Sequence, residues 1–281
     1  MSDVALRWPS SAGLVARQIR AQLLTFRRTP IALFFTIFLP LVMLVLFNAL
    51  FGDSEVETEQ GSWPINQFYA GGLAAFTAVT ATYTNLANMV PIRREEGVLK
   101  RWRGTPLSGA AYLAGFVGAA IVIAFIGAAI MLGVGVIAYD LEIEAAKLPA
   151  LLITFLVGVF TFSALGLAVA GLVPNARSAA AVANATILPL GFVSNIFIPL
   201  EDPPRWLEAV GNFFPLKPFA VSFQDTLNPL VEAPGFNWDQ LAWVALWGVA
   251  GALVAVRFFK WEASTGGRST RARSARRQAS A

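Results

Sequence analysis

The side chains best placed to do chemistry lie in one charged stretch, residues 92–108, between two long apolar segments. Acidic and basic residues alternate within it, and a glycine and a proline near its end are typical helix stops. Val98, Leu99 and Trp102 share one face of the predicted helix. Such an amphipathic helix suits docking in a groove of a cytoplasmic partner, whereas the alternative is a basic loop that only fixes membrane orientation. The candidate partner-coupling residues are Arg94, Glu95, Glu96, Gly97, Leu99, Arg101 and Trp102.

A second group of candidates consists of uncharged polar side chains inside apolar segments. Thr and Asn residues gather in residues 69–91 and 179–200, where they could line a path through a membrane. The alternative is that they bond neighbouring helices, each bond contributing about 0.6–2 kcal/mol. The candidate path residues are Thr80, Tyr83, Asn85, Asn88, Asn184, Thr186 and Asn195.

Two residue types that commonly do chemistry are missing, because the 281 residues contain no histidine and no cysteine. The commonest general base, the commonest metal ligand and any thiolate site are therefore excluded. The phosphate-binding pattern Gly-x-x-x-x-Gly-Lys-Ser/Thr does not occur either. We expect this chain to be no enzyme and to hold no metal or cofactor of its own.

The elements that must position these residues are membrane helices. The chain is 56% hydrophobic and 14% charged, far more apolar than an average soluble protein. About 20 apolar residues in a helix cross a bilayer, and six charge-free stretches have roughly that length. They are residues 31–51, 69–91, 107–139, 148–173, 179–200 and 241–256. We predict an all-α membrane protein with six transmembrane helices.

The distribution of charge predicts the orientation of the six spans. One set of connections and ends holds 18 of the 21 basic residues and four acidic residues. The other set holds three basic and 13 acidic residues. Basic residues concentrate on the cytoplasmic side, so both termini are predicted to be cytoplasmic.

The segments at the two ends complete the predicted organisation. Residues 1–30 include an amphipathic helix over 12–28, lying along the membrane surface before span one. Residues 31–260 form the six-span domain. Residues 261–281 are predicted to form a disordered basic cytoplasmic tail. Lipid attraction and topology account for its arginines, so no nucleic acid partner is expected.

The charged stretch resembles one family, the type-2 permeases of ATP-binding-cassette (ABC) exporters. In that family an Arg-Glu-x-Gly run follows the second span, and then come Leu, basic residues and Thr-Pro-Leu-Ser. The matching positions are Arg94, Glu95, Glu96, Gly97, Leu99, Arg101 and residues 105–108. Residues 198–218 are similar to the re-entrant helix pair that the family places outside, between spans five and six. Pro218 departs from the family, which often has Tyr, Ser or His there.

The resemblance covers about residues 10–260 and implies a division of labour. Residues 92–104 would be a coupling helix in a cleft of the ATPase, and residues 12–28 a connecting helix. Two permease copies, as a homodimer or related heterodimer, would pair above two ABC ATPase subunits. ATP and magnesium would bind to those ATPases and not to this chain.

The predicted function is export of a hydrophobic or amphipathic compound, of drug or antibiotic type, across a bacterial inner membrane. The alternative is an ion-coupled secondary transporter or a channel of six spans. Proton coupling usually needs Asp, Glu or His within the membrane, and the six stretches have none. Sodium coupling through backbone unwound near Pro40 or Pro189 stays open.

Overall fold

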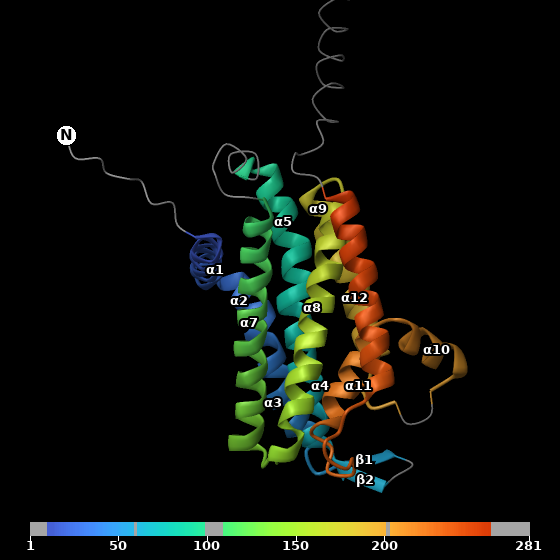
Figure 1. Ribbon diagram of the computed structural model, residues 1–281. Coiled ribbons are helices and arrows are strands. Elements are labelled where there is room, and N and C mark those ends of the chain that lie inside the picture. Colours follow the sequence, from blue (N-terminus) through green and yellow to red (C-terminus); the bar gives the residue numbers. More distant parts are fainter. Residues whose placement is uncertain (1–9, 59–60, 99–108, 201–202, 260–281) are drawn as a thin grey trace, which may run out of the picture.

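The computed structural model describes residues 10–58, 61–98, 109–200 and 203–259. These residues form an elongated bundle of long helices that run along one another (Figure 1). Helix α1 lies crosswise to the bundle, and a two-stranded hairpin lies at one of its ends. We call that end of the bundle the hairpin end. Helix α5 ends and α9 begins at the opposite end, which we call the α5 end.

Helix α1, Ser11–Arg27, is the helix predicted over 12–28, shifted by one residue at each end. The Ser10 hydroxyl caps it by accepting the Gly13 N–H at 3.2 Å. The helix crosses and packs against α7, Gly109–Ala138, where Gly118 leaves room for Ile19. Its position on a membrane surface stays a prediction.

The first long helix has three parts, α2 Pro30–Leu33, the π-helical η1 Phe34–Phe38, and α3 Leu39–Phe51. Pro40 has no N–H to donate to the preceding turn, and the wider π turn lies directly before it. Most large apolar side chains of this helix are exposed. It is therefore the most loosely packed long helix of the described bundle.

Strands β1 Glu55–Thr58 and β2 Gly61–Pro64 form an antiparallel hairpin that the sequence analysis did not predict. Val56 pairs with Trp63, and both are buried against the bundle. Glu55 and Glu57 lie on the exposed side. The alternation is only four residues long, too short to stand out beside the apolar helices.

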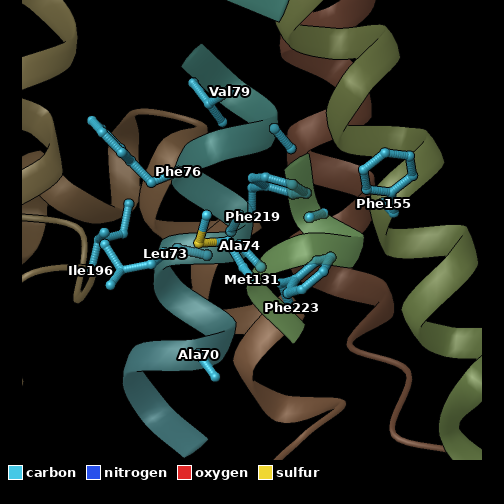
Figure 2. Packing of buried hydrophobic residues seen from close by; sticks show 14 of the residues in the cluster. Ala70, Leu73, Ala74, Phe76, Val79, Met131, Phe155, Ile196, Phe219 and Phe223 are labelled. Carbon is cyan, nitrogen blue, oxygen red and sulfur yellow. The ribbon is translucent and has the colours of Figure 1, made fainter. Parts of the chain in front are cut away.

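The second helical run is unbroken from Ile65 to Glu95. It consists of α4 Ile65–Val79, the π-helical η2 Thr80–Thr84, and α5 Asn85–Glu95. Almost every residue of α4 is buried, so this run is the centre of the bundle. Figure 2 shows the small Ala74 of α4 beside larger side chains of other elements, Met131 and Phe219.

The remaining long helices surround this centre. They are α7, α8 Leu148–Leu172, which follows the 3-10 turn η3 Ala145–Lys147, α9 Ala176–Phe192, and α12 Trp238–Phe258. Helix α8 packs most extensively against α12. Gly166 of α8 approaches the backbone of Tyr83, where a Cβ would lie 2.7 Å from the carbonyl oxygen.

Two shorter helices occupy the connection between α9 and α12, namely α10 Arg205–Phe213 and α11 Leu216–Asp225. Helix α11 packs into the bundle against α4, α8, α9 and α12, whereas α10 lies at its side (Figure 1). A helix pair is therefore present where the family resemblance implied one. Its re-entry into a membrane stays a prediction.

Four described helices are long and apolar enough to cross a membrane, Pro30–Phe51, Ala111–Ala138, Ala145–Leu172 and Trp238–Phe258. The chain is thus a mostly helical, multi-pass membrane protein. The other two predicted spans lie in the same bundle. Span 69–91 is part of the run from Ile65 to Glu95, and span 179–200 corresponds to α9, which ends earlier, at Phe192. Six crossings remain a proposal.

Candidate functional site

A concavity of about 580 Å³ lies between the first long helix, the run from α4 to α5, and α9. We call it the polar concavity, because hydroxyl and amide side chains lie among the large apolar ones that line it. The polar lining is Thr36, Thr80, Thr84, Asn85, Asn88 and Asn184. The apolar lining includes Ile31, Phe35, Leu39, Phe76, Ile187 and Leu188.

Two buried polar atoms of this lining have no hydrogen-bond partner in the described part of the chain, Oγ1 of Thr84 and Oδ1 of Asn88. The Thr80 hydroxyl differs, since it donates to the Phe76 carbonyl of its own helix at 2.9 Å. Buried polar atoms are nearly always hydrogen-bonded in proteins. Thr84 and Asn88 are therefore the candidates in this lining for binding a polar group from outside the chain.

The seven predicted path residues separate into three groups. Thr80, Asn85, Asn88 and Asn184 line the polar concavity. Tyr83 and Thr186 form the second group and Asn195 the third, and none of these three residues lines it. Thr36 and Thr84 line it without having been among the seven candidates, and a threonine in an apolar helix was their only signal.

Tyr83 and Thr186 line a different, almost wholly apolar concavity of about 540 Å³ between α8, α9 and α12. Their hydroxyl oxygens lie 2.6 Å apart. Thr186 also donates to the Val182 carbonyl at 2.8 Å, so Tyr83 is the donor of the shared hydrogen bond. This bond joins the central helical run to α9.

Asn195 lies in the turn after α9 and lines neither concavity. Its backbone has a φ of 56°, in the left-handed region that asparagine tolerates. Its side chain accepts the Leu200 N–H at 3.2 Å, and its carbonyl accepts from Gln224 Nε2 at 2.8 Å. These contacts shape the turn that ends the helix predicted over 179–200.

The charged stretch begins at the end of α5, where Arg94 is only 4% exposed. Its guanidinium donates from Nη1 to the Ala170 carbonyl at 3.1 Å and from Nη2 to the Val173 carbonyl at 2.7 Å. The Ala170 carbonyl lies in the last turn of α8 and the Val173 carbonyl directly after it, where carbonyls have no helical partners. Burial lowers the pKa of Arg94, and the charge of Glu95 opposes that shift.

Glu95 is exposed and bonds to the next helix along the chain. Its Oε1 accepts the backbone N–H of Ala176 at 2.7 Å. Ala176 is the first residue of α9, and the Asn175 side chain caps the same helix by accepting the Ser178 N–H at 2.8 Å. Adjacent residues of α5 therefore bind the end of α8 and the start of α9.

The other described residues of the stretch are half-buried or exposed. Arg93 and Glu96 form an exposed ion pair at 3.2 Å, one helical turn apart. Gly97 has a φ of 70° and donates to the Arg94 carbonyl at 3.1 Å, which is how glycine commonly ends a helix. Three predicted coupling residues, Leu99, Arg101 and Trp102, lie outside the described residues.

Comparison with known proteins identifies the family. Residues 15–227 match the family model of the ABC-2 type transporter. The chain belongs to the ABC-2 type transporter family. It is 26% identical over 224 residues to the daunorubicin resistance ABC transporter permease protein DrrB1 of Streptomyces coeruleorubidus, covering 77% of this chain and 74% of that protein. It is 28% identical over 207 residues to the putative transport permease ycf38 of Cyanophora paradoxa, covering 70% of this chain and 68% of that one.

The match confirms the resemblance read from the charged stretch. It extends from α1 to α11 and so includes both walls of the polar concavity and the end of α5. Permeases of this family are transmembrane components, and the family implies an ABC ATPase as partner. Both points agree with the prediction that ATP is hydrolysed on another chain.

The sequence analysis missed a buried cation at the hairpin end of the permease. Lys147 is 1% exposed, and its Nζ donates to Glu144 Oε1 at 2.7 Å and to the Asn228 carbonyl at 2.8 Å. Asp225 lies at the end of α11, shortly before Asn228 in the chain, is half-buried, and accepts from Asn237 Nδ2 at 3.1 Å. Burial raises the pKa of Asp225, and the bond from Asn237 opposes that shift. The one available signal was a single lysine beside three acids in residues 140–147.

Proposed function

We propose that this chain is the membrane subunit of an ATP-driven ABC exporter that moves a hydrophobic or amphipathic compound out of the cell. The family and the drug-resistance permease among its relatives support export of this kind. Neither favours the alternative of an ion-coupled carrier or channel. Two copies of the chain, as a homodimer or a related heterodimer, would work with two ABC ATPase subunits that bind ATP and magnesium.

The proposed setting is a bacterial inner membrane crossed six times, with both termini in the cytoplasm. The run from Ile65 to Glu95 and helix α9 would be the two crossings beyond the four long apolar helices. The concentration of basic residues supports a cytoplasmic position for the α5 end of the bundle. The hairpin, with Glu55 and Glu57, would then lie outside.

The polar concavity is the proposed translocation path, and its lining is the observation that carries the proposal. A compound with an apolar body and a few polar groups fits a pocket whose lining is mainly apolar and holds several hydroxyl and amide side chains. Thr84 and Asn88 supply two buried acceptors without partners in the described chain. Binding polar groups there would satisfy atoms that are costly to leave unpaired.

The segment that follows α5 is the proposed contact with the ATPase. Glu96 and Gly97 lie at its outward-facing start. Leu99, Arg101 and Trp102 continue it by sequence. Arg94 and Glu95 were predicted to take part, and both contact the permease itself.

The test is ATP-dependent uptake of fluorescent amphipathic compounds, including daunorubicin, into inverted membrane vesicles that hold the permease and its ABC ATPase. We expect Thr84→Val and Asn88→Leu each to lower uptake by about 5- to 10-fold, the effect of losing one hydrogen bond of about 1–1.5 kcal/mol. The abundance of each variant in the membrane is measured alongside.

Thr77→Val is the matched control for Thr84→Val. Thr77 lies in the same helical run and is also buried, but its hydroxyl donates to the Leu73 carbonyl and does not line the polar concavity. It should transport at the wild-type rate. Normal uptake by both Thr84→Val and Asn88→Leu would place the path elsewhere, and uptake without any ABC ATPase would refute the exporter class.

A further inference from the structure

Arg94 and Glu95 bind backbone groups on both sides of one short connection. Helix α8 ends at Leu172 and α9 begins at Ala176, so residues 173–175 make the whole turn between them. Arg94 holds carbonyls before and within this turn, and Glu95 holds the first N–H after it. Because the partners are backbone atoms, the contacts fix the path of the chain itself.

The charges of the two residues match the helix ends that they meet. A helix carries partial negative charge at its C-terminus and partial positive charge at its N-terminus. Arg94 lies at the C-terminus of α8, and Glu95 lies at the N-terminus of α9. The bonds are also charge-assisted, which makes them stronger than bonds between neutral groups.

The neighbouring pair shows that this placement is not a general property of charged residues at the end of α5. Arg93 and Glu96 have the same residue types and, among the described residues, bond to each other at the surface. Exposed pairs of that kind contribute little to stability. Exposure thus separates Arg94, which is buried, from Arg93, which is not.

Further contacts join the same three helices deeper in the bundle. Gly166 brings α8 against the backbone of Tyr83, and the Tyr83 hydroxyl bonds Thr186 of α9. Helices α5, α8 and α9 are therefore tied at the α5 end and again along their length. The first long helix forms the facing wall of the polar concavity and is mostly exposed.

We propose that Arg94 and Glu95 are positioning residues for energy coupling: they clamp the α8–α9 turn to α5, so that movement of the segment after α5 is delivered to α9. Asn184 lies eight residues beyond Ala176 in α9, about 12 Å along the helix axis. A rigid α9 would carry that movement to the polar concavity and shift its wall relative to the first long helix. The inference rests on the proposed exporter function.

Two substitutions remove the Glu95 bond from opposite sides. Glu95→Ala removes the acceptor. Ala176→Pro removes the donor, and proline is well tolerated at the first position of a helix. The preceding residue, Asn175, already has the extended backbone that a following proline favours. If the bond is the functional feature, the two variants share one phenotype, and the double variant is no worse than either alone.

Two other substitutions serve as controls. Asn175→Ala weakens the same end of α9 by removing its cap, yet leaves the link to α5 intact. Arg93→Lys alters a neighbouring arginine whose bond within the described chain is to the exposed Glu96. Both should behave like the wild-type chain in the measurements below.

The first measurement uses the full-length chain alone in lipid nanodiscs. Its sequence has no cysteine, so a pair of introduced cysteines can carry spin labels without background. Labels at Ile92 and Ala181 report the distance between α5 and α9. We expect a narrow distance distribution for the wild type and both controls, and a broadened one for Glu95→Ala and Ala176→Pro. Unchanged distributions in these two variants, or equal broadening in Asn175→Ala, would overturn the clamp.

The second measurement uses the complex with the ABC ATPase, with labels at Phe38 and Ala181 on opposite sides of the polar concavity. ATP with vanadate should change this distance in the wild type and the controls. Glu95→Ala and Ala176→Pro should lose that change while retaining the ATPase and its hydrolysis. An unaltered change in both variants would overturn the proposal.

These measurements distinguish three hypotheses: that Glu95 clamps α9 to α5, that Glu95 docks directly on the ATPase, and that the chain is an exporter subunit. Loss of ATPase binding in Glu95→Ala but not in Ala176→Pro would place Glu95 in the ATPase contact and overturn the clamp. A wild-type chain that retains no ABC ATPase would count against the exporter function. The distances measured on the chain alone would still decide whether α5 and α9 are clamped.

Discussion

Helix α8 is held by a buried cation at each end, and the two cations bind different kinds of partner. At its start, Lys147 binds the half-exposed carboxylate of Glu144 and the Asn228 carbonyl. At its end, Arg94 binds two backbone carbonyls of α8 and its turn. Both lie near helix termini, where a charge costs less than it does in the middle of a membrane span.

The difference between the partners suggests different tasks. Lys147 fastens residues 226–237, the connection before α12, and Gly235 lies over its side chain. That arrangement holds one loop in place. Arg94, together with Glu95, joins three helices, and a loop is only the short link between them. We therefore expect Lys147 to matter most for stability and Arg94 to matter most for coupling.

The largest stability effect should come from Lys147→Ala. The variant leaves a cavity at a fully buried position and removes the donor to the Asn228 carbonyl. Together these changes should cost about 2–5 kcal/mol of unfolding free energy. Thermal unfolding in detergent and proteolysis within residues 226–237 measure the loss.

Glu144→Gln is the control at the same contact. The Glu144 side chain is 48% exposed, so weakening its ion pair should cost about 1 kcal/mol or less. If Lys147→Ala has the same unfolding temperature and the same resistance to proteolysis as the wild type, Lys147 does not anchor residues 226–237. The proposed difference between the tasks of Lys147 and Arg94 would then be wrong.

A smaller effect is expected from Tyr83→Phe, which probes the second tie between the central run and α9. The variant deletes only the hydroxyl that bonds Thr186, a loss of about 0.6–2 kcal/mol for a bond between membrane helices. Because the Glu95 bond still holds the start of α9, the distance between labels at Ile92 and Ala181 should stay narrow. Broadening equal to that of Glu95→Ala would show that the clamp is not the dominant link.

Much of the helical architecture could be predicted because apolar length is a strong signal. The stretch 31–51 became Pro30–Phe51, and 148–173 became Leu148–Leu172. The boundaries of α9 were harder to predict from the sequence. Its start at Ala176 depends on the cap at Asn175, and its end at Phe192 depends on the turn around Asn195. A count of charge-free residues detects neither feature.

The candidate site was predictable as a set of residue types but not as a set of contacts. Arg93 and Arg94 are indistinguishable by composition, and their difference comes from carbonyls 76 and 79 residues further along the chain. Thr80 and Tyr83 belong to the same π-helical turn, yet they line different concavities. Lys147 was counted only for topology, because nothing local indicates that residues 226–237 cover it.

The smallest expected effect is the pH dependence of stability that comes from Asp225 at the hairpin end. At the α5 end, Glu95 is exposed, whereas Asp225, one of the acids at the hairpin end, is half-buried at the end of α11. Burial raises the pKa of Asp225 in the folded chain above its unfolded value. Between these two pKa values the folded chain keeps a proton that the unfolded chain has released. The contribution of Asp225 to stability is therefore highest below the unfolded pKa and falls as pH rises through the folded one.

Asp225→Asn tests this sign, because the amide oxygen can still accept from Asn237 without carrying a charge. The variant should be more stable than the wild type at neutral pH, and the difference should shrink as pH falls toward about 4, the usual pKa of an aspartate. Thermal unfolding at several pH values measures it, with the exposed Asp239→Asn as control. A constant difference across that range would mean that Asp225 is not penalised by burial, and the hairpin end would then be as tolerant of charge as the α5 end.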